Sequence, residues 1–167
     1  MKKIYTFGFL TIVLGVMLGC VFTPPASEKA KFKRYEEAKF DMSNPVMRVA
    51  KSQLGVPYRY GGDSYFAFDC SGFVAYVYQK ALGKRLPRTA RAQSKIGKAV
   101  RKDALKSGDL LFFDTAHRGH INHTGIYIAE GQFIQASSGR VHEVTISSLK
   151  SPFYKKAFRW ARRVKGE

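Results

Sequence analysis

The sequence predicts an α+β domain in which N-terminal helices pack on one face of an antiparallel β-sheet. Apolar residues recur at helical spacing up to about residue 95, and β-rich runs separated by Gly, Asp and Ser signals follow from about residue 109. Helices first and strands afterwards favour this segregated arrangement over alternating strands and helices. With 167 residues, less an N-terminal leader, the chain has room for one domain with a single core.

Two of the expected helices are recognised by their starts. Ser43-Asn44-Pro45 supplies a cap and a proline near the first helical position, and apolar residues continue at helical spacing to about Leu54. Farther along, Pro87 breaks the chain, and Thr89 caps a short helix that runs to about residue 95.

The helix between these two begins at a cysteine. Phe73, Val74 and Val77 follow Cys70 with the spacing of a helix that buries one face, and Gly83 is the expected stop. Cys70 therefore lies in the first turn of a helix, directly after an extended segment.

The strands of the expected sheet all lie in the second half of the chain. Each is rich in β-branched and aromatic residues and is bounded by turn residues. The five runs cover residues 109–113, 123–128, 132–136, 141–146 and 157–164.

The N-terminus reads as a bacterial lipoprotein leader. Two lysines, an apolar stretch to about Leu18 and then Gly19-Cys20 follow the plan of a secretory signal that is cleaved before a cysteine. We therefore expect a signal peptide over residues 1–19, lipidation of Cys20, a tether over residues 20–42 and a folded domain over residues 43–167. This places the protein in the bacterial cell envelope. In a Gram-negative cell, Val21 after the lipidated cysteine directs it to the periplasmic face of the outer membrane.

The chain is strongly basic, with 29 Lys and Arg against 12 Asp and Glu and a formal charge of +17. Such an excess attracts anionic polymers. The sequence has no RNP-type, helix-turn-helix or zinc-finger pattern, so we expect no nucleic-acid partner. In the envelope the candidate polyanions are lipid headgroups, lipopolysaccharide and teichoic acid, and the alternative is a solvated basic surface without a specific ligand.

Cys70 is the candidate nucleophile. The chain has two cysteines, and if Cys20 is lipidated then Cys70 has no disulfide partner. The free N–H groups and the dipole at a helix start favour a thiolate, so the sequence predicts that the pKa of Cys70 falls from about 8.5 toward roughly 3.5–7.5. The alternative role is that of a small buried apolar residue.

A thiol nucleophile needs a base and a group that orients the base. His123 opens a predicted strand, and a three-residue turn at Ala129-Glu130-Gly131 places Gln135 diagonally opposite it on the same face of the hairpin. The amide oxygen of Gln135 can accept a ring N–H of His123, which leaves the other ring nitrogen free to take the thiol proton. This mechanism requires no metal or cofactor.

Six ordered motifs resemble the NlpC/P60 family of cell-wall cysteine peptidases. The motifs lie at residues 54–62, 68–73, 108–113, 123–128, 133–137 and 161–164. The likeness extends over about residues 45–165, which is essentially the whole expected domain. The resemblance implies a papain-like α+β fold and hydrolysis of peptide bonds in the stem or cross-links of peptidoglycan. It implies Cys70 as the nucleophile and His123 as the base. Gln135 departs from the pattern, because many members carry a second histidine there.

The same resemblance implies roles for three further residues. Tyr58 would line the active site and polarise the scissile carbonyl, with core packing as its alternative role. Asp69 and Ser71 would contact the free amine of the stem peptide, and either could instead cap the helix. The backbone N–H of Cys70 is a second candidate donor to the oxyanion.

Three rival interpretations remain open on the sequence alone. Asp114, His117, His120 and His123 could form a metal site, although no Glu lies beside the histidines as in HExxH enzymes. A murein-binding scaffold lipoprotein could have kept the fold and lost turnover. A thiol acyltransferase or amidase is the third, and the order of cysteine before histidine favours the peptidase. The sequence does not choose the peptidoglycan bond.

Overall fold

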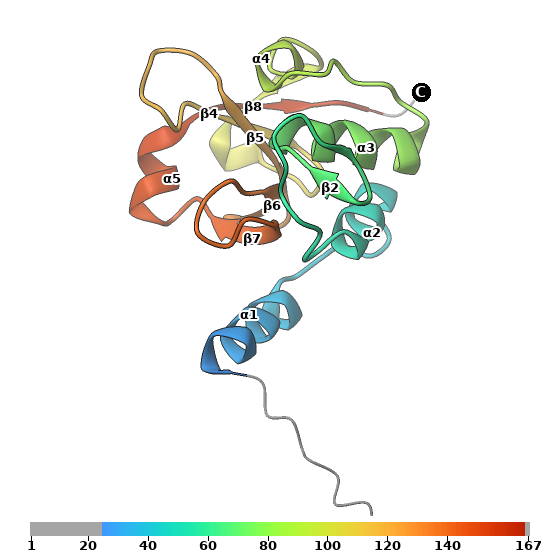
Figure 1. Ribbon diagram of the computed structural model, residues 1–167. Coiled ribbons are helices and arrows are strands. Elements are labelled where there is room, and N and C mark those ends of the chain that lie inside the picture. Colours follow the sequence, from blue (N-terminus) through green and yellow to red (C-terminus); the bar gives the residue numbers. More distant parts are fainter. Residues whose placement is uncertain (1–24, 166–167) are drawn as a thin grey trace, which may run out of the picture.

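The computed structural model describes residues 25–165 (Figure 1). The predicted signal peptide over residues 1–19 and the predicted lipidation site Cys20 lie outside the described residues. The predicted α+β class is confirmed, since helices pack against a six-stranded sheet in the order β3-β8-β4-β5-β6-β7, and every neighbouring pair of its strands is antiparallel.

The elements follow one another along the chain as helices first and a strand-rich half afterwards. The helices are α1 (Ala26–Glu37), α2 (Pro45–Ser52), α3 (Cys70–Leu82), α4 (Ala90–Gln93), the 3-10 helix η1 (Lys102–Ala104) and α5 (Pro152–Ala157). The strands are β1 (Asp63–Ser64), β2 (Ala67–Phe68), β3 (Lys98–Val100), β4 (Leu110–Phe113), β5 (His123–Tyr127), β6 (Gln132–Ala136), β7 (Val144–Ser148) and β8 (Phe158–Arg163).

The large sheet buries both of its faces. On one face Phe112 and Ile134 belong to the core formed with α2 and α3. On the other face Leu111 and Phe133 pack in a smaller core that includes Ala157 of α5, and α5 lies apart from α2 and α3 in Figure 1. Burial on both faces explains why β4 is a continuous apolar run instead of an alternating one.

Helix boundaries follow the capping signals in the sequence. Asn44 accepts the N–H of Val46 at 2.9 Å, and the hydroxyl of Thr89 accepts the N–H of Ala92 at 3.3 Å. Gly83 ends α3 in the left-handed conformation at φ 67°. These caps were predicted, and the structure confirms them.

The structure adds three short strands that were not predicted, β1, β2 and β3, and two of the predicted strands differ in detail. β7 begins at Val144 and not at residue 141, because His142 has φ 50° and its N–H bonds the carbonyl of Gly139 in a turn. The predicted strand over residues 157–164 is preceded by helix α5, whose start is capped by Ser151 and has Pro152 at its first position. Ser151-Pro152 is itself a helix-start signal in the sequence.

The segment predicted to be a tether contains helix α1, and α1 contacts the β7 end of the sheet. Lys31 Nζ lies 2.9 Å from a carboxylate oxygen of Glu143. The hydroxyl of Tyr35 donates to Glu143 at 3.0 Å and is 3.2 Å from the hydroxyl of Thr145. Residues 26–37 are therefore attached to the domain along this edge.

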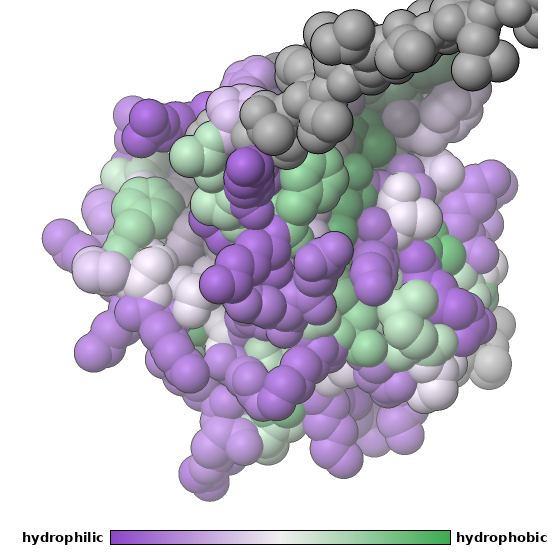
Figure 2. Space-filling view, turned by 90° about the horizontal axis from the view of Figure 1, so that it is seen from below, coloured by the Kyte–Doolittle hydropathy of each residue, from purple (hydrophilic) through white to green (hydrophobic). Residues whose placement is uncertain are grey.

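The face viewed from below in Figure 2 is covered largely by hydrophilic residues, with smaller apolar patches between them. Among the helices that the structure describes, none has the length and apolar character needed to span a membrane.

Candidate active site

The first turn of α3 is fixed by its cap and by a close backbone contact. Asp69 caps the helix, since its Oδ1 accepts the N–H of Gly72 at 2.7 Å. The N–H of Asp69 donates to the carbonyl of Gly62 at 2.8 Å. A methyl group at position 72 would lie 2.0 Å from the carbonyl oxygen of Gly62. Only glycine therefore allows the loop at Gly62 to pack this closely against α3. These contacts hold Cys70 at the helix start.

The thiol of Cys70 lies beside β5. The backbone N–H groups of Thr124, the residue after His123, and of Ser71 lower the pKa of the thiol. Burial outweighs both and, with the negative charge of Asp69, raises the pKa of Cys70 to about 11. The predicted thiolate is therefore wrong for the resting site, because desolvation exceeds the stabilisation that a helix start provides.

His123 and Gln135 meet as predicted. Strands β5 and β6 pair with Ile126 opposite Ile134, so His123 and Gln135 are diagonal neighbours on one face. His123 Nε2 hydrogen-bonds the amide oxygen of Gln135. An amide oxygen only accepts, so Nε2 carries the hydrogen and Nδ1 keeps its lone pair. Burial lowers the pKa of His123 to about 4, partly offset by this hydrogen bond, and the ring rests neutral.

The amide of Gln135 is held in turn by two hydroxyls. Gln135 is fully buried, and its Nε2 donates to Ser147 Oγ at 2.7 Å and to Tyr154 Oη at 2.5 Å. Neither partner was predicted. Ser147 lies at the end of β7, beyond the strand expected there, and Tyr154 lies on the unpredicted helix α5.

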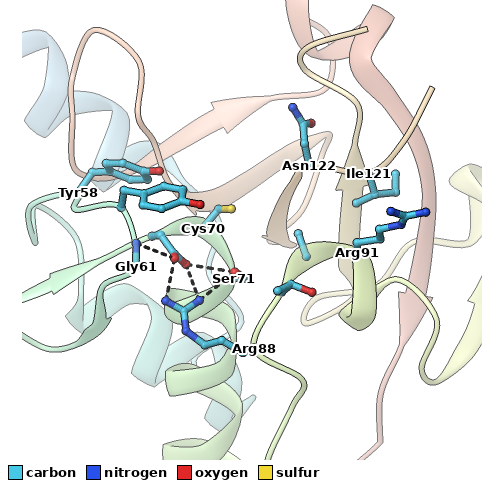
Figure 3. Close-up of a pocket in the computed structure, with 12 residues that line it drawn as sticks. Tyr58, Gly61, Cys70, Ser71, Arg88, Arg91, Ile121 and Asn122 are labelled. Atoms are coloured by element: carbon cyan, nitrogen blue, oxygen red, sulfur yellow. Dashed lines mark hydrogen bonds and ion pairs between the residues drawn. The ribbon is translucent and has the colours of Figure 1, made fainter. Parts of the chain in front are cut away.

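A cavity of about 490 Å³ opens in front of the nucleophile. Its lining includes four residues that the sequence predicted for the site: Tyr58, Asp69, Cys70 and Ser71. It also includes residues that were not predicted. Figure 3 shows Cys70 between two walls, with Tyr58, Gly61 and Ser71 on its own side and Arg91, Ile121 and Asn122 opposite.

Arg88 is the main residue that sequence reasoning missed. Its guanidinium donates hydrogen bonds to both carboxylate oxygens of Asp69, at 3.0 Å and 2.7 Å, and lies 3.2 Å from the hydroxyl of Ser71 (Figure 3). Burial pushes the pKa of Asp69 upward, but Arg88 and the N–H of Gly72 hold it below its usual value. Arg88 follows the break at Pro87, and no local pattern in the sequence marks it as a partner of Asp69.

Tyr58 lies at the rim of this cavity. Its ring is half-buried and packs edge-on against His142 at a centroid distance of 5.1 Å. Burial and the nearby Cys70 thiol raise the pKa of Tyr58, so its hydroxyl keeps its proton and can donate a hydrogen bond.

The histidines of the possible metal string do not converge. His117 and His120 are exposed in the loop before β5, and both oxygens of Asp114 already accept hydrogen bonds from the N–H groups of Arg118 and Gly119. Within residues 25–165, no group of three His, Cys, Asp or Glu side chains is arranged to hold a metal ion.

Comparison with known protein families identifies the family of this chain. A model of the NlpC/P60 family matches residues 55–163. The chain belongs to the NlpC/P60 family. Its fold is the papain-like α+β fold of that family, as the sequence resemblance implied.

Several curated relatives of this NlpC/P60 chain have names that describe hydrolytic enzymes. It is 43% identical over 120 residues to the gamma-DL-glutamyl hydrolase of Bacillus subtilis, covering 71% of this chain and 29% of the relative. It is 39% identical over 124 residues to the murein DD-endopeptidase MepS/murein LD-carboxypeptidase of Escherichia coli, covering 74% and 64%. The chain thus spans less than two thirds of the length of these curated relatives.

A solved structure shares the fold. The crystal structure of an NlpC/P60 family protein from Bacillus cereus aligns with a TM-score of 0.66 and 34% sequence identity. The alignment covers 77% of this chain and 42% of that one.

Proposed function

We propose that this protein is a lipid-anchored peptidoglycan endopeptidase that cleaves an amide bond of the stem peptide or the cross-link through an acyl-enzyme on Cys70. The observation that carries the proposal is Cys70 at the start of α3 beside β5, where His123 is oriented by Gln135. Membership of the NlpC/P60 family and relatives named as murein endopeptidases support the reaction and the substrate class.

The reaction begins from a neutral thiol and a neutral imidazole. As Cys70 Sγ attacks the carbonyl carbon, its proton passes to Nδ1 of His123, and the hydrogen bond from Nε2 to Gln135 stabilises the resulting imidazolium. The backbone N–H of Cys70 and the hydroxyl of Tyr58 donate to the oxyanion. The imidazolium then protonates the leaving amine. Water, deprotonated by His123, hydrolyses the thioester and restores the thiol.

Asp69, Ser71 and Arg88 form the polar side of the cleft. The carboxylate of Asp69 lies at the cavity wall and stays ionised, so it can receive the free amine of a stem peptide while Arg88 holds it in place. In this proposal the side chain of Asp69 both caps α3 and contacts the substrate.

The test compares the protein with its Cys70→Ala variant on purified muropeptides and resolves the products by mass. We expect new fragments with the parent alone, and their masses identify the bond. If both proteins bind sacculi and neither produces fragments, the alternative of a murein-binding scaffold is correct. Fragments produced equally by both proteins would exclude Cys70 as the nucleophile.

The proposal of a lipid anchor is based on Met17-Leu18-Gly19-Cys20, which resembles the motif at which lipoprotein signals are cleaved. Lipidation there would hold the enzyme at a membrane, since each buried methylene contributes about 0.8 kcal/mol. Labelled fatty acid should be incorporated into the parent chain and not into Cys20→Ser when both are expressed in a bacterium.

The neutral resting pair predicts a broad pH profile. Because the pKa of His123 is lowered to about 4 and that of Cys70 is raised to about 11, both groups keep the forms needed for proton transfer between these values. We expect kcat/KM to fall on the acid side near pH 4, far below the ordinary histidine pKa of about 6.5, and to stay level to at least about pH 9. A fall beginning near pH 8 would instead indicate a thiolate and imidazolium pair at rest.

A further inference from the structure

A second cavity lies behind the catalytic hydrogen bonds, between α1, the β7 end of the sheet and α5. It measures about 280 Å³, and its polar lining includes Arg34 of α1, Gln132 of β6, Ser147 and Ser148 of β7, and Ser151 and Tyr154 at α5. Ser147 and Tyr154 are the two hydroxyls that accept the amide hydrogens of Gln135. Gln135 therefore links the hydroxyls that line this cavity to His123 through hydrogen bonds.

The lining supplies hydrogen-bond donors and positive charge. Ser147, Ser148 and Tyr154 each accept a hydrogen bond through the hydroxyl oxygen, and none of the three hydroxyls donates a hydrogen bond to a side chain or backbone group that the structure describes. None of the described residues that line the cavity is acidic. Arg34 is exposed and forms no ion pair with a described carboxylate, while Glu143, the carboxylate that contacts α1, is paired with Lys31.

We propose that this cavity binds a small organic carboxylate and that the bound anion activates Cys70 through Gln135 and His123. A planar carboxylate matches the donor fork of a guanidinium. A cavity of this volume has room for a molecule of the size of an acylated amino acid. Within this proposal Arg34 binds the ligand, and Ser147 and Tyr154 are positioning residues.

The coupling follows from the direction of the hydrogen bonds. An anion that accepts from the hydroxyls of Ser147 and Tyr154 makes their oxygens better acceptors for the amide of Gln135, and hydrogen bonds in such a chain polarise one another. The amide oxygen then stabilises the imidazolium form of His123 more strongly. Proton transfer from Cys70 becomes easier when the cavity is occupied.

The inference rests on the proposed role of His123 as the base of Cys70, and its test needs no peptidoglycan. Acetate and N-acetyl-D-alanine are titrated into the full chain by calorimetry, and alkylation of Cys70 by the uncharged reagent iodoacetamide is followed at constant ionic strength. We expect saturable binding and, at saturation, alkylation at least about fivefold faster. Absence of binding up to about 100 mM ligand, or binding without acceleration, would overturn the proposal.

Variants separate this site from a general charge effect. Arg34→Met should weaken binding at least about tenfold and leave the ligand-free alkylation rate unchanged. Lys33→Met, on the same helix and with the same loss of charge, should retain both binding and acceleration. Equal acceleration in the parent and Arg34→Met would overturn the site.

Positioning is tested at Ser147. Ser147→Ala should lose the acceleration, and Ser147→Thr, which keeps a hydroxyl, should retain it. Loss of the acceleration in both variants would contradict a role for the hydroxyl. If alkylation of ligand-free protein is the same in the parent and in His123→Ala, it is the proposed function that fails.

Discussion

Replacing His123 with alanine is expected to slow amide hydrolysis at pH 7 by about 100-fold to 10,000-fold, the range that general-base catalysis contributes. The upper end applies here, because a thiol with a pKa of about 11 is ionised only to about one part in 10,000 at pH 7. Without a base, the variant depends on this small thiolate fraction. Its rate should therefore rise about tenfold for each pH unit between neutral and about pH 10, while the parent stays level.

The measurement is the pH dependence of hydrolysis, supported by iodoacetamide alkylation of Cys70 in the same two proteins. His120→Ala is the matched control, since His120 is an exposed loop histidine whose Nδ1 contacts the carbonyl of Arg118 at 3.2 Å. It should behave as the parent does. A His123→Ala variant with a level pH profile would show that another group deprotonates the thiol.

Replacing Gly72 with alanine is expected to remove most activity and to lower the free energy of unfolding by about 1–3 kcal/mol. The added methyl group would meet the backbone carbonyl oxygen of Gly62 at 2.0 Å and the Cα of Asp63 at 3.0 Å. Backbone atoms cannot rotate away as a side chain can, so α3 or the loop must shift. Because Cys70 lies two residues before Gly72, the shift displaces the sulfur from β5.

Denaturant unfolding measures the stability change, and iodoacetamide alkylation reports the environment of the thiol. Gly139→Ala serves as the control, because a methyl group there would meet only the hydroxyl of Ser137 at 3.3 Å. We expect that variant to keep parental stability and alkylation. Parental activity in Gly72→Ala would mean that the loop contact does not set the position of Cys70.

Local patterns predicted the parts of the site that depend on neighbours in the sequence. The turn at residues 129–131 fixed the register of β5 and β6, and this register alone places His123 beside Gln135. The start of α3 and its stop at Gly83 were readable from apolar spacing and from the glycine. Each of these features is decided within about fifteen residues.

What the sequence could not predict depends on burial and on distant partners. The pKa of Cys70 is raised by the burial of its thiol among residues that are distant in the sequence, and no local motif carries that information. Ser147 is as close in sequence to Gln135 as His123 is, at 12 residues, and it was missed because the expected strand ended at residue 146. Tyr154 reaches Gln135 from α5, 19 residues away. Arg88 reaches Asp69 across 19 residues, so the ion pair is visible only after α3 has brought the two chain segments together.

The shared use of Asp69 limits how this cleft can change during evolution. One carboxylate starts the helix that carries the nucleophile and also faces the cavity beside Arg88. A mutation that altered this end of the cleft to suit a different ligand would at the same time loosen the reactive cysteine. New specificities are therefore expected to arise on the opposite wall at Arg91, whose exposed side chain lines the cavity from α4 and forms no hydrogen bond with another described residue.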